Sequence, residues 1–265
     1  MEIRGETEKK LIQWLYSSVM EDEPVDQGKR NFLKAMIVVS AGAAVIGTLN
    51  GVIRNIITPA AGLTSFPVLT LVDEVTGQPI HTSDIKVNST KAYIYYYPLD
   101  NDPNFLIRLG DISGNDVRVS PFNVNIPATG GTFRSPGGVG PYGSVVSFSA
   151  ICQHLGCVPP IIHYYKGGLS IPGHPELPLI ETGYIHCNCH GSTYDPLEGA
   201  KVVTGPTVKP LPNTILDFDP TTDTYRVRSM IGPTIYGKPN DLQGGTPFPS
   251  GTKTTPVTTL DVSGA

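Results

Sequence analysis

Two short segments hold all four cysteines of this 265-residue chain, and each also holds one histidine. The first reads Cys152-Gln153-His154-Leu155-Gly156-Cys157, and the second reads Cys187-Asn188-Cys189-His190-Gly191-Ser192-Thr193-Tyr194-Asp195. Thiolates and imidazoles are the ligands that zinc and iron–sulfur centres take in proteins. These groups outnumber the ligands of a tetrahedral metal. We therefore expect one cysteine and one histidine of each segment to bind metal, and the other two cysteines to form a disulfide.

The two segments resemble the cluster-binding motifs of the Rieske iron–sulfur proteins. The resemblance implies one [2Fe–2S] cluster per chain, with two cysteines on one iron and two histidines on the other. By position, Cys152 and Cys187 would hold the first iron, His154 and His190 the second, and Cys157 and Cys189 would form a disulfide. Ser192 and Tyr194 would donate hydroxyl hydrogen bonds to a bridging sulfide and to a cysteine sulfur, which raises the reduction potential.

Simpler interpretations exist for each of these residues. Two cysteines and two histidines could hold a structural zinc ion instead of a cluster. Ser192 could be an ordinary loop residue and Tyr194 an ordinary packed side chain. His163, His174 and His186 match no position of the motifs, and we interpret them as ordinary loop or surface histidines.

The composition predicts short strands joined by turns and long loops, because glycine (29) and proline (25) are abundant. Apolar and β-branched runs predict strands at residues 68–72, 91–97, 105–109, 117–119, 145–148, 215–218 and 225–228, with a hairpin turn over 219–223. The glycine-rich stretch 129–144 is expected to be a loop. We predict an all-β protein, in which an antiparallel Rieske β-sandwich base domain (67–236) carries a smaller cluster-binding subdomain (149–212).

The two ends of the sequence differ in composition from the rest of the chain. Residues 1–30 are charged, and residues 31–54 are apolar over a length that can span a bilayer as one helix. Lys29, Arg30 and Lys34 precede this span and only Arg54 follows it, so the N-terminus is expected in the cytoplasm and the Rieske domain on the extracytoplasmic side of the cell membrane. Lys29-Arg30 resembles a twin-arginine export signal with lysine at the first position. Residues 55–66 would form a hinge or linker, and residues 237–265 a flexible tail.

The resemblance implies an electron-transfer subunit of a respiratory quinol-oxidising complex, similar to the membrane-anchored Rieske proteins of thermoacidophilic archaea. Its partners would be membrane quinol, a cytochrome b-type subunit and a cytochrome or terminal-oxidase acceptor. His154 or His190 would take the quinol proton. Quinol oxidation needs the cytochrome b-type partner, so no enzymatic activity is assigned to the chain alone. The net charge of −4 shows no basic patch for nucleic acid.

Three other classes share some of these features. The small subunit of an arsenite-oxidase-type enzyme is also exported and carries similar motifs. Rieske ferredoxins and oxygenase components share the ligands but normally lack the disulfide cysteines and the anchor. A zinc-stabilised surface protein is the alternative without redox chemistry. Separately, Asn88-Ser89-Thr90 is a glycosylation sequon, which is relevant only outside the cytoplasm.

Overall fold

The computed structural model describes residues 66–235 and 246–261. The expected cytoplasmic segment (1–30), the expected anchor (31–54) and nearly all of the expected linker (55–66) lie outside these residues. Among the described residues there is no helix with the length and apolar character needed to cross a membrane. The membrane location therefore stays a prediction.

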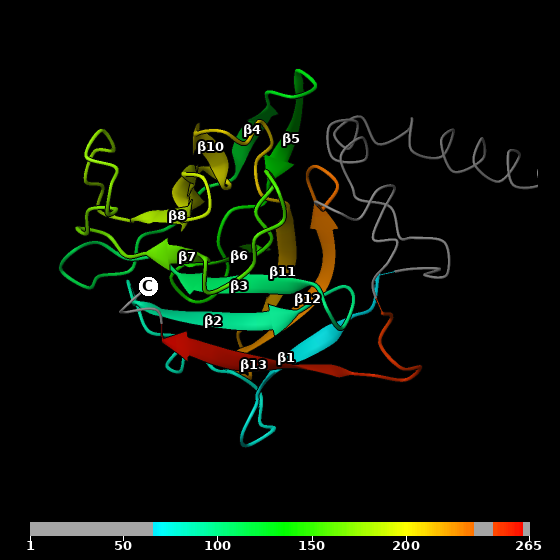
Figure 1. Cartoon of the computed structure of the whole chain (residues 1–265). Coiled ribbons are helices and arrows are strands. Elements are labelled where there is room, and N and C mark those ends of the chain that lie inside the picture. Colours follow the sequence, from blue (N-terminus) through cyan, green and yellow to red (C-terminus); the bar gives the residue numbers. More distant parts are fainter. Residues whose placement is uncertain (1–65, 236–245, 262–265) are drawn as a thin grey trace, which may run out of the picture. The chain divides into compact units, whose positions relative to one another are not determined.

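The described residues form an all-β fold, which confirms the predicted class (Figure 1). One short 3₁₀ turn, η2 (Pro196–Glu198), interrupts the strands. The strands are β1 (Leu69–Asp73), β2 (Lys91–Tyr96), β3 (Pro103–Arg108), β4 (Phe122–Ile126), β5 (Gly131–Ser135), β6 (Val145–Ser149), β7 (Ile162–Tyr165), β8 (Tyr184–Cys187), β9 (Ser192–Asp195), β10 (Lys201–Thr204), β11 (Asn213–Asp219), β12 (Thr224–Ile231) and β13 (Thr254–Asp261).

The base is a closed barrel and not the expected sandwich. Its strand order is β1-β12-β11-β6-β3-β2-β13. Neighbouring strands are antiparallel except β1 and β13, which run parallel. The barrel closes because β13 pairs with β1 on one side and with β2 on the other, so neither β1 nor β2 is left as a free edge.

Strand β13 also corrects the prediction of a flexible tail over 237–265. Residues 254–261 are threonine-rich, and the tail prediction took that polarity as a sign of disorder. Threonine and valine are β-branched, however, and favour a strand wherever a partner strand is available. Here Thr255 and Val257 are buried, and Figure 1 shows β13 beside β2 and β1.

Two further expectations were wrong. The stretch 129–144, expected to be a loop, contains β5, which pairs with β4 and buries Phe133 against Val124. Residues 117–119, expected to be a strand, belong to none of the described strands. The other strand predictions fall on β1, β2, β3, β6, β11 and β12, and the predicted turn over 219–223 joins the paired residues Asp219 and Thr224.

The second sheet, β10-β9-β8-β7, packs on the outside of the barrel. Successive side chains of a strand point to opposite faces, so β2 sends Tyr93 and Tyr95 into the barrel core and Ala92 and Ile94 to its outer face. That outer face shares one apolar cluster with residues of the second sheet, including Tyr194. Burial on both faces explains why β2 and β3 are almost continuously apolar.

Candidate metal centre

The two cysteine-containing segments lie in two loops with fixed backbones. The first follows β6, and its turn is closed by the Gly156 amide donating to the Cys152 carbonyl (2.9 Å) and the Cys152 amide donating to the Cys157 carbonyl (2.9 Å). The second is the turn between β8 and β9, closed by the Gly191 amide donating to the Cys187 carbonyl (3.0 Å). Gly156 and Gly191 have φ of +81° and +88°, a conformation that glycine adopts without steric cost.

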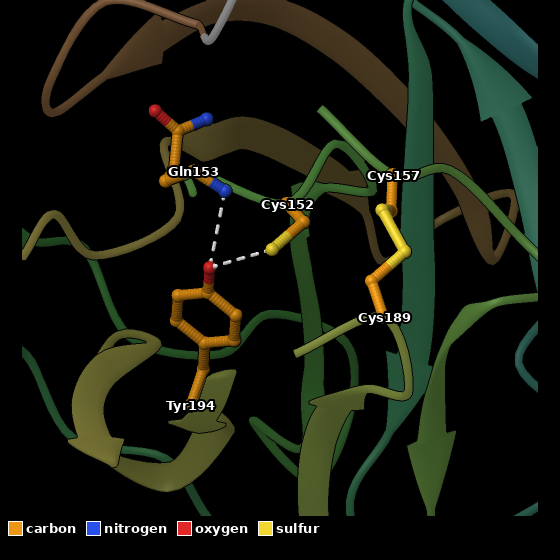
Figure 2. Close-up of a disulfide and its surroundings, with 5 residues drawn as sticks. All are labelled: Cys152, Gln153, Cys157, Cys189 and Tyr194. Carbon is orange, nitrogen blue, oxygen red and sulfur yellow. Dashed lines mark hydrogen bonds between the residues drawn. A yellow bond between two sulfur atoms is a disulfide. The ribbon is translucent and has the colours of Figure 1, made fainter. Parts of the chain in front are cut away.

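A disulfide joins the two loops, as predicted. The Sγ atoms of Cys157 and Cys189 are bonded, and their Cα atoms are 6.9 Å apart (Figure 2). The bond links residues that are 32 positions apart in the sequence. It therefore holds each segment at a fixed distance from the other, which a site built from both segments requires.

The other two cysteines are buried thiols that face each other. Cys152 and Cys187 are free and each is 1 % exposed. Their side chains are hydrogen-bonded, which lowers the pKa of Cys152 and raises the pKa of Cys187. Thiolate is the form in which a cysteine binds metal.

The two histidines of the segments lie beside each other. The ring centroids of His154 and His190 are 4.9 Å apart, with the rings nearly perpendicular. His190 is exposed and His154 is partly exposed. Among the described residues, the Nδ1 atom of His154 is nevertheless buried and finds no hydrogen-bond partner. A buried polar atom without a partner is unusual, and a metal ion would satisfy it.

These four side chains fit a Rieske cluster. The disulfide brings the segments together, both free thiols are buried, and Nδ1 of His154 has no hydrogen-bond partner in the part of the chain that the structure describes. Two thiolates for one iron and two imidazoles for the other are the donors that such a cluster requires. Cys152, Cys187, His154 and His190 are accordingly the residues that would hold it.

Tyr194 connects the two segments through its hydroxyl group. Its Oη atom lies 3.4 Å from the Sγ of Cys152 and accepts a hydrogen bond from the Gln153 amide at 3.1 Å (Figure 2). Tyr194 is fully buried, and burial raises the pKa of its phenol well above the ordinary value. The hydroxyl therefore stays protonated and can donate its hydrogen to the sulfur.

Ser192 lies at the start of β9 and is also buried. Its Oγ accepts a hydrogen bond from the Thr207 amide at 3.2 Å, and its own hydrogen bond is among those that lower the pKa of Cys152. Neither Thr207 nor Gln153 was predicted to contribute to the site. Gln153 contributes its backbone amide, a group that every non-proline residue has. Its residue type therefore could not mark it as part of the site, and only its place between Cys152 and His154 could.

The interpretation of the remaining histidines was partly wrong. His163 and His186 are buried on the paired strands β7 and β8, and only His174 lies in a loop. Burial lowers the pKa of His186 to about 4, with smaller contributions from the charges of His174 and His163. No sequence motif marks these residues, and their burial is a property of the paired strands β7 and β8.

Comparison with known proteins agrees with this site. Residues 134–215 match the Rieske [2Fe-2S] domain. The chain is 25% identical over 195 residues to the cytochrome b6-f complex iron-sulfur subunit of Synechococcus sp. (strain JA-3-3Ab), covering 73% of this chain and 84% of that protein. It is 25% identical over 142 residues to the cytochrome bc1 complex Rieske iron-sulfur subunit of Streptomyces lividans, covering 54% and 69%.

Among solved structures, the soluble domain of the Rieske protein II from Sulfolobus acidocaldarius is 28% identical, with a TM-score of 0.43, and covers 63% of this chain and 80% of that one. Residues 134–215 form a Rieske [2Fe–2S] domain. The cofactor that belongs to a Rieske domain is a [2Fe–2S] cluster.

Proposed function

We propose that this protein is the electron-transfer Rieske subunit of a quinol-oxidising respiratory complex, which passes electrons one at a time to a cytochrome or terminal-oxidase acceptor. The observation that carries the proposal is the buried Tyr194 hydroxyl 3.4 Å from the Cys152 sulfur. Hydrogen bonds to cluster sulfurs raise the potential toward the range that a quinol can reduce. The names of the relatives support the proposal, because they are subunits of b6-f and bc1 complexes.

In this proposal each residue has a defined task. The buried Cys152 and Cys187 would hold one iron of the cluster, and the more exposed His154 and His190 would hold the other. When bound, the cluster supplies a one-electron acceptor. The exposed ring of His190, or the partly exposed ring of His154, takes the proton that quinol releases. Tyr194 stabilises the added negative charge on Cys152, and the disulfide keeps both histidines at one surface.

The proposal also gives the protein a location in the membrane and a partner subunit. Residues 31–54 would anchor the chain with its N-terminus in the cytoplasm, and the Rieske domain would be extracytoplasmic. An extracytoplasmic location suits the Cys157–Cys189 disulfide, because disulfides persist in oxidising compartments. A cytochrome b-type subunit would complete the quinol site beside His154 and His190.

The test is the midpoint potential of the purified full-length holoprotein as a function of pH. If a ligand histidine takes a proton with the electron, the potential is constant at low pH. It then falls by about 59 mV per pH unit once the histidine deprotonates in the oxidised state. A midpoint potential that stays constant from neutral to strongly alkaline pH would contradict the proton-coupled mechanism. Co-purification of the full chain with a cytochrome b-type subunit is expected, and co-purification with a molybdenum subunit would point to the arsenite-oxidase class instead.

A further inference from the structure

The segment between β7 and β8, residues 166–183, is a folded unit and not a loose connection. Its apolar side chains Ile171, Leu177 and Ile180 form a small core together with Tyr165 at the end of β7 and Tyr184 at the start of β8. The Gly168 amide donates to the Ile180 carbonyl at 3.0 Å, which closes the segment near its base. A segment with its own core can hold a side chain in a fixed place.

This segment is tied to the barrel side of the molecule by Asn88. The Asn88 Nδ2 donates to the Asp111 carbonyl at 2.8 Å, and its Oδ1 accepts from the Gly167 amide at 2.7 Å. The amide nitrogen that would carry a sugar in the sequon is therefore engaged in the folded protein. Asn88 acts here as a structural tie that fixes the start of the segment.

The segment also places the ring of His174 against the turn between β8 and β9, which contains Gly191. A Cβ atom added to Gly191 would lie 2.9 Å from Cε1 and 3.3 Å from Nε2 of His174, so the ring lies directly against the Gly191 backbone. The ring is held by a hydrogen bond between its Nδ1 and Glu176 Oε1 at 2.8 Å, and by an edge contact with His186 at 4.6 Å between centroids.

Gly191 follows the ligand His190 directly, and its carbonyl accepts a hydrogen bond from Thr204 Oγ1 at 3.0 Å. The backbone at Gly191 is therefore held by the Thr204 bond, by the bond of its own amide to the Cys187 carbonyl, and by the His174 ring. His190 itself is exposed. The direction of an exposed imidazole depends strongly on the backbone that carries it, so whatever fixes Gly191 also fixes His190.

We propose that His174 is a positioning residue for the cluster ligand His190, acting through Gly191, and that the segment 166–183 serves to hold it there. His174 does not touch the metal in this proposal. It restricts the cluster loop so that His190 keeps one orientation. The inference depends on the cluster and not on quinol oxidation, so it can fail or hold independently of the proposed function.

The test compares three variants of the full-length holoprotein. His174→Ala removes the ring from Gly191, His174→Phe keeps a ring there without the bond to Glu176, and Leu179→Ala alters an exposed side chain (63 % exposed) of the same segment. Three quantities are measured: the EPR g values of the reduced protein, the half-life of the cluster, and the midpoint of thermal unfolding.

His174→Ala is expected to broaden or shift the EPR signal and to lose iron on the order of 10-fold faster, the usual scale for residues that orient metal ligands. His174→Phe should restore most of the wild-type signal, and Leu179→Ala should leave it unchanged. The proposal is overturned if His174→Ala keeps the wild-type EPR signal and half-life. It is also overturned if His174→Ala and Leu179→Ala lower the unfolding midpoint and the half-life equally, because the segment would then contribute only stability.

Discussion

The hydroxyl oxygen of Tyr194 lies 3.4 Å from the sulfur of Cys152, although 42 positions separate the two residues in the sequence. This contact joins the segment after β6 to β9, the strand at the end of the second segment. It places a buried hydrogen-bond donor on one of the two buried thiols, in an interior where a hydrogen bond is electrostatically stronger than in water.

Tyr194→Phe is expected to lower the reduction potential of the cluster, because the reduced, more negative state loses a hydrogen bond that favours it. A net hydrogen-bond contribution of about 1 kcal/mol corresponds to a decrease of roughly 40–50 mV for a one-electron couple. Redox titration followed by EPR measures the change.

Tyr164→Phe is the matched control for that substitution. Tyr164 is also a buried tyrosine, but its hydroxyl donates to the Thr182 carbonyl at 2.6 Å and not to a sulfur. The control should lose some stability and keep the wild-type potential. An equal decrease in both variants would show that the Tyr194 contact has no specific effect.

Replacing both Cys157 and Cys189 with alanine should shorten the half-life of the bound cluster, with only a minor effect on its reduction potential. The disulfide closes a span of 32 residues, and the loop-entropy model assigns such a closure about 3–4 kcal/mol of stability. Without it the two loops separate more readily and the cluster is released. The visible absorbance of the holoprotein, followed over time with and without the disulfide, tests this. A double variant with an equally persistent cluster would contradict it.

The ion pair between Arg108 and Asp116 should make the barrel sensitive to acid. Its two bonds are 2.7 Å each, Nε to Oδ1 and Nη2 to Oδ2, and the side chains are only 13% and 15% exposed. Burial by itself would raise the pKa of Asp116, but the hydrogen bonds from Arg108 and Ser144 and the guanidinium charge lower it below its ordinary value. The pair therefore stabilises the fold above about pH 4, and this stability is lost as pH falls through the lowered pKa.

Asp116→Asn is expected to reduce the free energy of unfolding at neutral pH by about 1–3 kcal/mol, because the partly buried Arg108 loses its charged partner. The variant should also lose less further stability than the wild type as the pH drops below 4. Denaturant unfolding at several pH values measures both effects. Parallel pH profiles for the two proteins would show that Asp116 is not the group responsible.

Deleting residues 246–265 should open the barrel. Strand β13 pairs with both β1 and β2, so its removal exposes the backbone groups of two strand edges and the core around Leu71 and Tyr95. Circular dichroism and thermal unfolding of the truncated protein should show loss of the cooperative transition. A truncated protein that unfolds at the wild-type midpoint would mean that β13 adds little to the fold.

The chemistry of the site could be predicted from the sequence because it depends on residue types at fixed short spacings. The pairing of Cys157 with Cys189 was implied by the resemblance to the Rieske motifs, and the structure confirms it. Each predicted ligand is a residue whose side chain has few other uses in such a pattern. Local composition also located the strands with continuous apolar runs, such as β2 and β6.

The remaining features depend on contacts between distant parts of the chain. The threonine-rich β13 is a strand only because β1 and β2 offer it partners. His163 and His186 are buried in the second sheet, although no motif distinguishes them from surface histidines. Asn88 fits a sequon equally well whether or not its amide nitrogen is engaged, and only the position of the Asp111 carbonyl, 2.8 Å from its Nδ2, shows that it is. These contacts join residues that are far apart in the sequence, so the local sequence does not specify them.

The most direct test of the central claim is the EPR spectrum of the purified full-length protein before and after addition of ascorbate. Ascorbate is a mild reductant, so it reduces only a high-potential cluster. If Cys152, Cys187, His154 and His190 hold a high-potential [2Fe–2S] cluster, a Rieske-type signal appears after ascorbate. A signal that appears only with dithionite would contradict the quinol-oxidising function, and bound zinc without any signal would contradict the cluster itself.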